Sequence, residues 1–150
     1  MATTDWPKRI DICPWGNWYS VHEVTGSASG RSQDSTYLSG GNFGSGGGPS
    51  VAGWYVEYKV PLAAGTWAVT LIITTVSHRG IFDTKLDGVN IISGTDAYSA
   101  GLVTNVVVDT TGIVIAASSV KTLRFEVTGK NASSSAYSWG AQWLTFRRTA

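Results

Sequence analysis

The stretch Gly53-Trp-Tyr-Val-Glu-Tyr-Lys-Val-Pro-Leu-Ala-Ala-Gly-Thr-Trp-Ala-Val-Thr-Leu71 decides the fold class of this chain. Residues 54–60 alternate between an apolar face and a polar face, which is the period of a half-buried β-strand. Residues 61–65 supply a turn, and residues 66–76 form a longer strand that ends in β-branched residues. The inward side chains are expected to be Trp54, Val56, Tyr58, Val60, Trp67, Val69, Leu71 and Ile73.

Downstream, the same pattern recurs in short segments that are separated by loops. Asp87-Gly88 is a strong hairpin signal, because glycine supplies the positive φ that a two-residue turn needs. No segment shows a sustained helical period. About nine short strands, in two halves of similar pattern, predict an all-β fold, an antiparallel jelly-roll β-sandwich. The remaining strands are expected at residues 17–25, 81–86, 89–92, 102–108, 113–116, 120–128 and 137–147.

The N-terminal third differs in composition from the rest. Residues 1–16 are expected to be irregular, and residues 26–53 are rich in glycine and serine. Such a segment is either a flexible linker or a loop that becomes ordered against a partner. Its few large apolar side chains favour partial docking, since a pure linker has no use for them. We therefore divide the chain into an N-terminal arm with a Gly/Ser-rich loop, residues 1–50, and a jelly-roll sandwich, residues 51–150.

Composition excludes several classes of function. The 150 residues are only 14% charged and carry a net charge of +1, so the basic surface of a nucleic-acid-binding protein is absent. Cys13 is the only cysteine, which excludes an internal disulfide framework. Neither a signal peptide nor a membrane-spanning segment is expected from the apolar pattern. The low charge and the seven tryptophans favour neutral contact surfaces, either between subunits or toward sugars.

Six short motifs occur in a fixed order along the second part of the chain. They are Val60-Pro-Leu-Ala-Ala-Gly-Thr-Trp67, Arg79-Gly80-Ile81, Leu86-Asp87-Gly88, Gly94-Thr95-Asp96-Ala97-Tyr98, Thr122-Leu123-Arg124-Phe125 and Thr128-Gly129-Lys130-Asn131. Together they resemble a domain that recurs in virion proteins of tailed bacteriophages, in fibre tips and capsid-surface proteins. That domain is similar in layout to the galactose-binding-like jelly rolls used as carbohydrate-binding modules. The resemblance covers residues 53–148.

This resemblance implies a non-enzymatic virion structural protein, expected to be trimeric and displayed on the particle surface. The predicted role is that of a capsid decoration or head-fibre subunit, which contacts the major capsid or fibre protein through residues 1–50. The alternative is a lectin-like fibre-tip module that recognises a host surface glycan. A polysaccharide hydrolase is a further, less favoured alternative. No cofactor, nucleic acid or membrane partner is expected.

Candidate contact residues fall into two groups. Residues in or beside loops are candidates for binding sugar hydroxyls or carboxylates, for which arginine and asparagine are suitable donors. On the last strand, the alternation predicts that one of two apolar faces meets a subunit or a ligand, because Trp139 and Trp143 oppose Leu144 and Phe146. The ligand candidates are His78, Arg79, Tyr98, Lys130, Asn131 and Tyr137, and the subunit-contact candidates are Trp139, Trp143, Trp15, Tyr37 and Phe43.

The carboxylates offer weaker signals. Loop aspartates are the oxygen ligands that Ca²⁺ prefers, but Asp87 is explained by its turn and Asp109 by a strand end, so no metal site is predicted. Asp83 and Glu126 are the pair that a glycosidase would need across a cleft, and nothing in their spacing demands that arrangement. The nucleophile elbow of a serine hydrolase is absent. No catalytic residue is therefore predicted.

Overall fold

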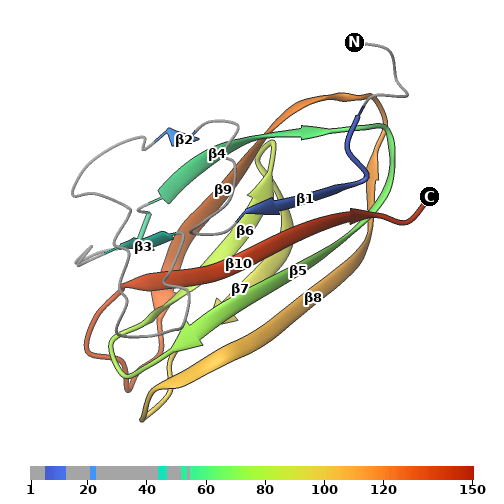
Figure 1. Cartoon of the computed structure of the whole chain (residues 1–150). Helices are drawn as coiled ribbons and strands as arrows, with labels where there is room; N and C mark the ends of the chain where they lie inside the picture. Colours follow the sequence, from blue (N-terminus) through green and yellow to red (C-terminus); the bar gives the residue numbers. More distant parts are fainter. Residues whose placement is uncertain (1–5, 13–20, 23–43, 47–51, 54) are drawn as a thin grey trace.

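Strands account for all the regular structure in the described part of the chain (Figure 1). The computed structural model describes residues 6–12, 21–22, 44–46, 52–53 and 55–150. That part offers no long apolar helix of the kind that crosses a membrane. The strands are β1 (Arg9–Ile12), β2 (Val21–His22), β3 (Gly44–Gly46), β4 (Tyr55–Leu62), β5 (Gly65–Thr75), β6 (Gly80–Leu86), β7 (Val89–Asp96), β8 (Val103–Ile115), β9 (Ser119–Lys130) and β10 (Trp139–Arg148).

The strands form two antiparallel sheets that pack face to face. The first sheet has the order β1-β10-β5-β8, and β3 pairs with the opening residues of β10. The second sheet has the order β2-β4-β9-β6-β7. In Figure 1, β10, β5 and β8 run side by side as one layer in front of the second sheet. The all-β antiparallel sandwich predicted from the sequence is confirmed.

The alternation of β4 and β5 fills the core as predicted. Inward side chains of both strands are almost fully buried, while most of their outward neighbours stay partly exposed. Trp67 is fully buried, and its Nε1 donates a hydrogen bond to the Ala63 carbonyl at 2.9 Å, so its one polar atom is satisfied. Trp54 and the side chain of Val56 lie outside the described residues. The predicted inward residues that the structure buries are Tyr58, Val60, Trp67, Val69, Leu71 and Ile73.

Aromatic rings tie the two sheets together at the centre of the core. Trp139 of the first sheet stacks on Phe125 of the second, with ring centroids 5.0 Å apart and an interplanar angle of 16°. Phe82 lies 5.9 Å from Trp139, and Tyr58 meets Phe125 edge-on at 6.0 Å. Each such pair adds about 0.5–1.5 kcal/mol beyond the burial of its area. Trp139 is therefore a central core residue.

A β-bulge in β10 determines which of its side chains face the core. The register between β10 and β5 shifts between Ala141 and Trp143, and an inserted residue reverses the alternation. As a result Trp139, before the bulge, is buried together with Leu144 and Phe146, which follow it. Trp143 faces outward and is partly exposed. The prediction that Trp139 is a subunit contact on the same face as Trp143 is therefore wrong.

The main departures from the predicted strands lie in β1, β8 and β7. Residues 9–12, expected to be irregular, form β1, whose Ile10 and Ile12 are buried and whose backbone pairs with β10. These residues form an edge strand of the first sheet. β8 is one strand instead of the two that were predicted. Gly112, at φ +75°, lies at a register shift, and pairing with β5 continues on both sides of it. β7 continues to Asp96, into the segment expected to be a loop.

Candidate functional site

Three loops lie together at one end of the sandwich, and they carry most of the predicted ligand candidates. They are residues 76–79 between β5 and β6, 97–102 between β7 and β8, and 131–138 between β9 and β10. Backbone hydrogen bonds join them: the Ser135 amide, for example, donates to the Ser77 carbonyl at 3.0 Å. We call this region the loop end. The structure thus brings together candidates that are up to about 60 residues apart in sequence.

The polar side chains of the loop end mostly bind one another. Asn131 donates from Nδ2 to Asp96 Oδ2 at 2.8 Å, and the backbone amide of Tyr98 donates to Asp96 Oδ1 at 3.0 Å. Lys130 Nζ lies 5.3 Å from the centre of the Tyr137 ring, within the range of a cation–π contact. Tyr98 and Tyr137 are both partly exposed. These contacts fasten the loops together and leave the two tyrosines as the aromatic groups available at this end.

His78 and Arg79, the remaining candidates of the loop end, differ in accessibility. His78 is partly exposed, and burial, followed by the charge of Arg79, lowers the pKa of His78, so its imidazole is neutral at pH 7. Arg79 is buried, and its Nη1 donates to the Trp139 carbonyl. Its guanidinium lies against Gly140, where a Cβ would come within 2.6 Å of Nη1. The prediction that Arg79 contacts a ligand is therefore wrong, because the group is enclosed by the start of β10.

A second cluster lies on the outward side of the first sheet, around Trp143, and we call it the Trp143 face. The strand registers of β10, β5 and β8 align Trp143, Ile72 and Val107 in one row across the sheet, the apolar row. All three side chains are partly or well exposed. A second outward row lies two residues along each strand from the apolar row, and we call it the polar row. It consists of Asp11, Thr145, Thr70 and Asp109.

The Trp143 indole is held by hydrogen bonds that it donates to the polar row. Its Nε1 donates to Thr145 Oγ1 at 2.9 Å and to Asp11 Oδ1 at 3.3 Å, and the Thr145 hydroxyl donates to the same Asp11 oxygen at 2.7 Å. Arg9 pairs with Asp11 at 2.9 Å. Burial alone would raise the pKa of Asp11, but hydrogen bonds from Thr145, Arg9 and Trp143 outweigh it and lower that pKa. At neutral pH a carboxylate therefore holds the ring in place.

The sequence reasoning identified Trp143 and missed the groups that hold it. Asp11 was overlooked because its segment was expected to be irregular, although the alternation of Arg-Ile-Asp-Ile at residues 9–12 is the signal that could have found it. Trp143 is partly exposed, and its role as a subunit contact stays a prediction. The other predicted contacts, Trp15, Tyr37 and Phe43, lie outside the described residues.

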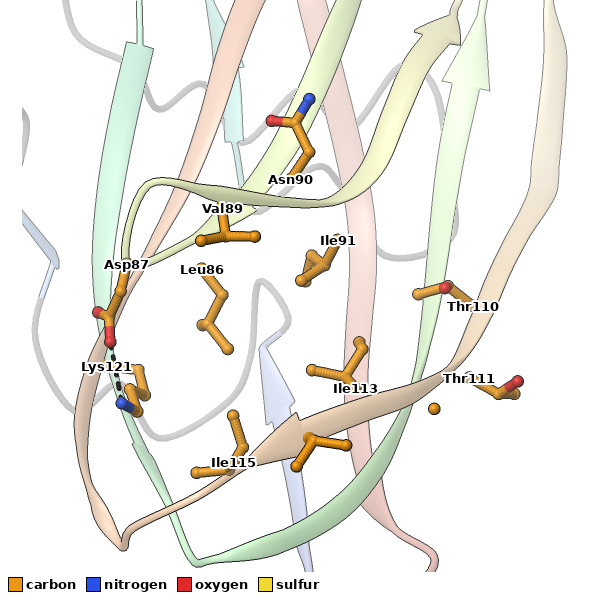
Figure 2. A pocket seen from close by; sticks show the side chains of 12 residues that line it. Leu86, Asp87, Val89, Asn90, Ile91, Thr110, Thr111, Ile113, Ile115 and Lys121 are labelled. Carbon is orange, nitrogen blue, oxygen red and sulfur yellow. Dashed lines mark ion pairs between the residues drawn. The ribbon is translucent and has the colours of Figure 1, made fainter.

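A groove of about 480 Å³ opens between β8 and the β6–β7 hairpin, at the ends of these strands that lie away from the loop end (Figure 2). The Asp87 carboxylate and the Lys121 ammonium form an ion pair of 3.0 Å at its rim. Burial alone would raise the pKa of Asp87, but hydrogen bonds from the Thr122 amide and Lys121 lower it. The floor is aliphatic and has no aromatic ring, so it suits apolar contact better than sugar stacking. Figure 2 shows its side chains, Leu86, Val89, Ile91, Ile113 and Ile115.

The carboxylates considered for catalysis lie on the outward face of the second sheet. Asp83 and Glu126 are direct cross-strand neighbours on β6 and β9. Asp83 accepts a hydrogen bond from Asn90, and Glu126 pairs with Lys85 at 2.9 Å and with Arg124 at 3.4 Å. Two neighbouring carboxylates on one sheet face do not flank a sugar from opposite sides as glycosidase carboxylates do. Among the described residues, no three His, Cys, Asp or Glu side chains gather as a metal site.

Comparison with known proteins reveals similarity of fold. No family model and no curated protein matches the chain. The structure of a Paenibacillus xanthan lyase matches with a TM-score of 0.56 and 23% identity, over 67% of this chain and 10% of the lyase, so this chain spans about a tenth of that protein. The CBM36-1 domain of a multidomain xylanase from the hindgut metagenome of Trinervitermes trinervoides matches with a TM-score of 0.53 and 15% identity, over 95% of this chain and 98% of that domain. The chain therefore has the jelly-roll β-sandwich fold of a carbohydrate-binding module.

Proposed function

We propose that this protein binds carbohydrate without transforming it, and that the Trp143 face is its binding surface. The observation that carries the proposal is the indole of Trp143, held on an outward sheet face by Thr145 and Asp11. Indole faces pack well on the CH groups of sugar rings, and the neighbouring hydroxyl and carboxylate groups accept hydrogen bonds from sugar hydroxyls. Because the ring is already fixed, little side-chain freedom is lost on binding.

The fold supports the same class of ligand. The chain matches the CBM36-1 domain of a xylanase over nearly the full length of both. We transfer only the class of ligand, a glycan, and assign the site from the residues of this chain. The side-by-side arrangement of Asp83 and Glu126, each with its own partner, favours binding over hydrolysis.

Binding to a panel of soluble polysaccharides, measured by affinity electrophoresis and then by calorimetry, tests the proposal. We expect Trp143→Ala to weaken binding roughly tenfold or more, which corresponds to about 1.4 kcal/mol or more of lost stacking and contact. Trp143→Phe keeps a ring and is expected to retain part of the affinity. Tyr137→Ala, at the loop end, is the matched control and is expected to bind as the parent does.

Each outcome assigns or removes the site. Loss of affinity in Tyr137→Ala with full affinity in Trp143→Ala would move the site to the loop end and refute the assignment to the Trp143 face. Absence of binding to every glycan in the panel by the folded parent protein would refute carbohydrate binding. Circular dichroism spectra of each variant establish that it is folded.

Display on a phage particle, as a capsid decoration or head-fibre subunit in a trimer, is the second candidate. It is favoured by exposed apolar side chains that line the groove, where Val89 is 68% exposed and Val114 73%. Such a group is typical of a surface that another subunit covers. Light scattering of the purified protein tests this candidate: a stable trimer that Val114→Asp dissociates supports it, and a monomer at all concentrations contradicts it.

A further inference from the structure

The apolar row runs across the strands rather than along them. On each of the three strands, the outward residue that follows the row in the polar-row direction is polar: Thr145 on β10, Thr70 on β5 and Asp109 on β8. The apolar groups Trp143 and Val107 are therefore joined across the sheet through Ile72. Neighbouring strands lie about 4.8 Å apart, so the row is roughly 10 Å long from β10 to β8.

Polar groups border the apolar row on both sides. On one side, the polar row lies two residues along the strands from the apolar row, a distance of roughly 7 Å. On the other side, the exposed Asn105 lies two residues before Val107 on β8, and its backbone amide donates a hydrogen bond to Gln142 Oε1 at 3.1 Å. An apolar strip with polar edges complements a chain of sugar rings, which presents CH groups on its faces and hydroxyls along its edges.

The charges of the polar row favour a neutral chain. Its two ionisable members are aspartates, of which Asp11 pairs with Arg9, and its other two members are threonines. Asp11 is ionised at neutral pH, as an ordinary aspartate is, and its hydrogen bonds lower its pKa further. Carboxylates accept hydrogen bonds from hydroxyl groups and repel the carboxylates of uronic acids. Hydroxyl-rich, uncharged sugars fit this border.

The twist of the sheet limits the shape of the ligand. Adjacent strands rotate by roughly 20–25° relative to one another, so the row turns by roughly 40–50° between β10 and β8. A flat crystalline surface would contact only part of such a row. A single polysaccharide chain turns about its glycosidic bonds and follows it.

We infer that the Trp143 face binds one extended, neutral glycan chain, which crosses β10, β5 and β8 and places three consecutive sugar rings on Trp143, Ile72 and Val107. This inference rests on the proposed function and adds the class of glycan, its direction and its length. Trp143 provides the first ring with a stacking surface, and the two aliphatic side chains contact the second and third rings. The hydroxyls along one edge of the chain bind the polar row.

Calorimetry with β-1,4-linked gluco-oligosaccharides of two to six rings tests the inference. We expect affinity to rise several-fold from the disaccharide to the trisaccharide and to level off beyond it. Val107 is 56% exposed, so Val107→Thr changes only one surface group. This variant should bind the trisaccharide no more tightly than the disaccharide. Val103→Thr is the matched control, with the same exchange on the same strand at a position that is 47% exposed and away from the row, and should behave as the parent does.

Two further soluble ligands and crystalline cellulose complete the experiment. Malto-oligosaccharides, whose α-1,4 links coil the chain, and β-1,4-linked mannuronate oligosaccharides, which are charged, should both bind more weakly than the gluco-oligosaccharide of equal length. Binding that depends on Trp143 but is independent of chain length and of Val107→Thr overturns this inference and leaves the proposed function standing. Tighter binding to crystalline cellulose, to mannuronate or to malto-oligosaccharides also overturns it. If no glycan binds, the proposed function itself fails.

Discussion

Replacing Gly140 by alanine tests whether the buried Arg79 guanidinium holds the start of β10. The new Cβ would lie 2.6 Å from Nη1, 2.7 Å from Cζ and 2.7 Å from Nη2 of Arg79, so the guanidinium has to move. Movement breaks the hydrogen bond from Nη1 to the Trp139 carbonyl. Overpacking typically costs 1–3 kcal/mol, and a hydrogen bond to a charged group contributes about 1.5–3 kcal/mol. Since the two effects share one movement, we expect a loss of about 2–4 kcal/mol.

Thermal and urea denaturation, followed by circular dichroism, measure this loss. At this chain length it corresponds to a decrease in Tm of roughly 5–15 °C. Gly129→Ala is the matched control, since Gly129 is also in a strand and its Cβ would meet nothing within 4 Å. That variant should be neutral or more stable by about 0.4–1 kcal/mol. Equal effects of the two substitutions, or a Gly140→Ala protein as stable as the parent, would refute the reasoning.

Three further predictions concern stability. The pKa of Asp11 is lower in the folded than in the unfolded protein, so the stability that Asp11 contributes is present above about pH 4 and is lost as the pH falls through the folded pKa. Urea titrations over this pH range should show that the free energy of unfolding falls less steeply with acid in Asp11→Asn than in the parent. Trp67→Phe leaves the buried Ala63 carbonyl without its donor and should cost about 1–3 kcal/mol, and an unchanged urea midpoint would contradict the assigned hydrogen bond. Asn105 has φ +58°, so Asn105→Val should cost about 1–2 kcal/mol while Asn105→Gly is tolerated, a contrast that thermal denaturation of the pair can test.

The strands could be predicted from the sequence wherever the two-residue alternation of apolar side chains was uninterrupted. In β5, Trp67, Val69 and Leu71 follow one another on the inward face, and nothing between them alters the count. The turn at Asp87-Gly88 was predictable for a similar reason, because the φ angles of +48° and +84° are a local requirement that glycine meets.

The candidate site was less predictable, because it depends on distant strand registers. One inserted residue between Ala141 and Trp143 reverses the alternation, and no local feature of the sequence marks it. The bond between Thr145 and Asp11 joins residues 134 positions apart. Alternation fixes which residues share a face of one strand, but it does not reveal which strands are neighbours or how they align.

The pairing of β1 with β10 also has a consequence for the order of assembly. Arg9–Ile12 leaves the ribosome long before Trp139–Arg148, so β1 has no edge to join while most of the domain is being made. Contacts of this sequence separation form slowly, and a chain waiting for them is exposed to misfolding. The hydrogen bond from Trp143 to Asp11, across 132 positions, can form only when synthesis of the domain is almost complete. The surface that we propose to bind glycan is thus incomplete until β10 has been made.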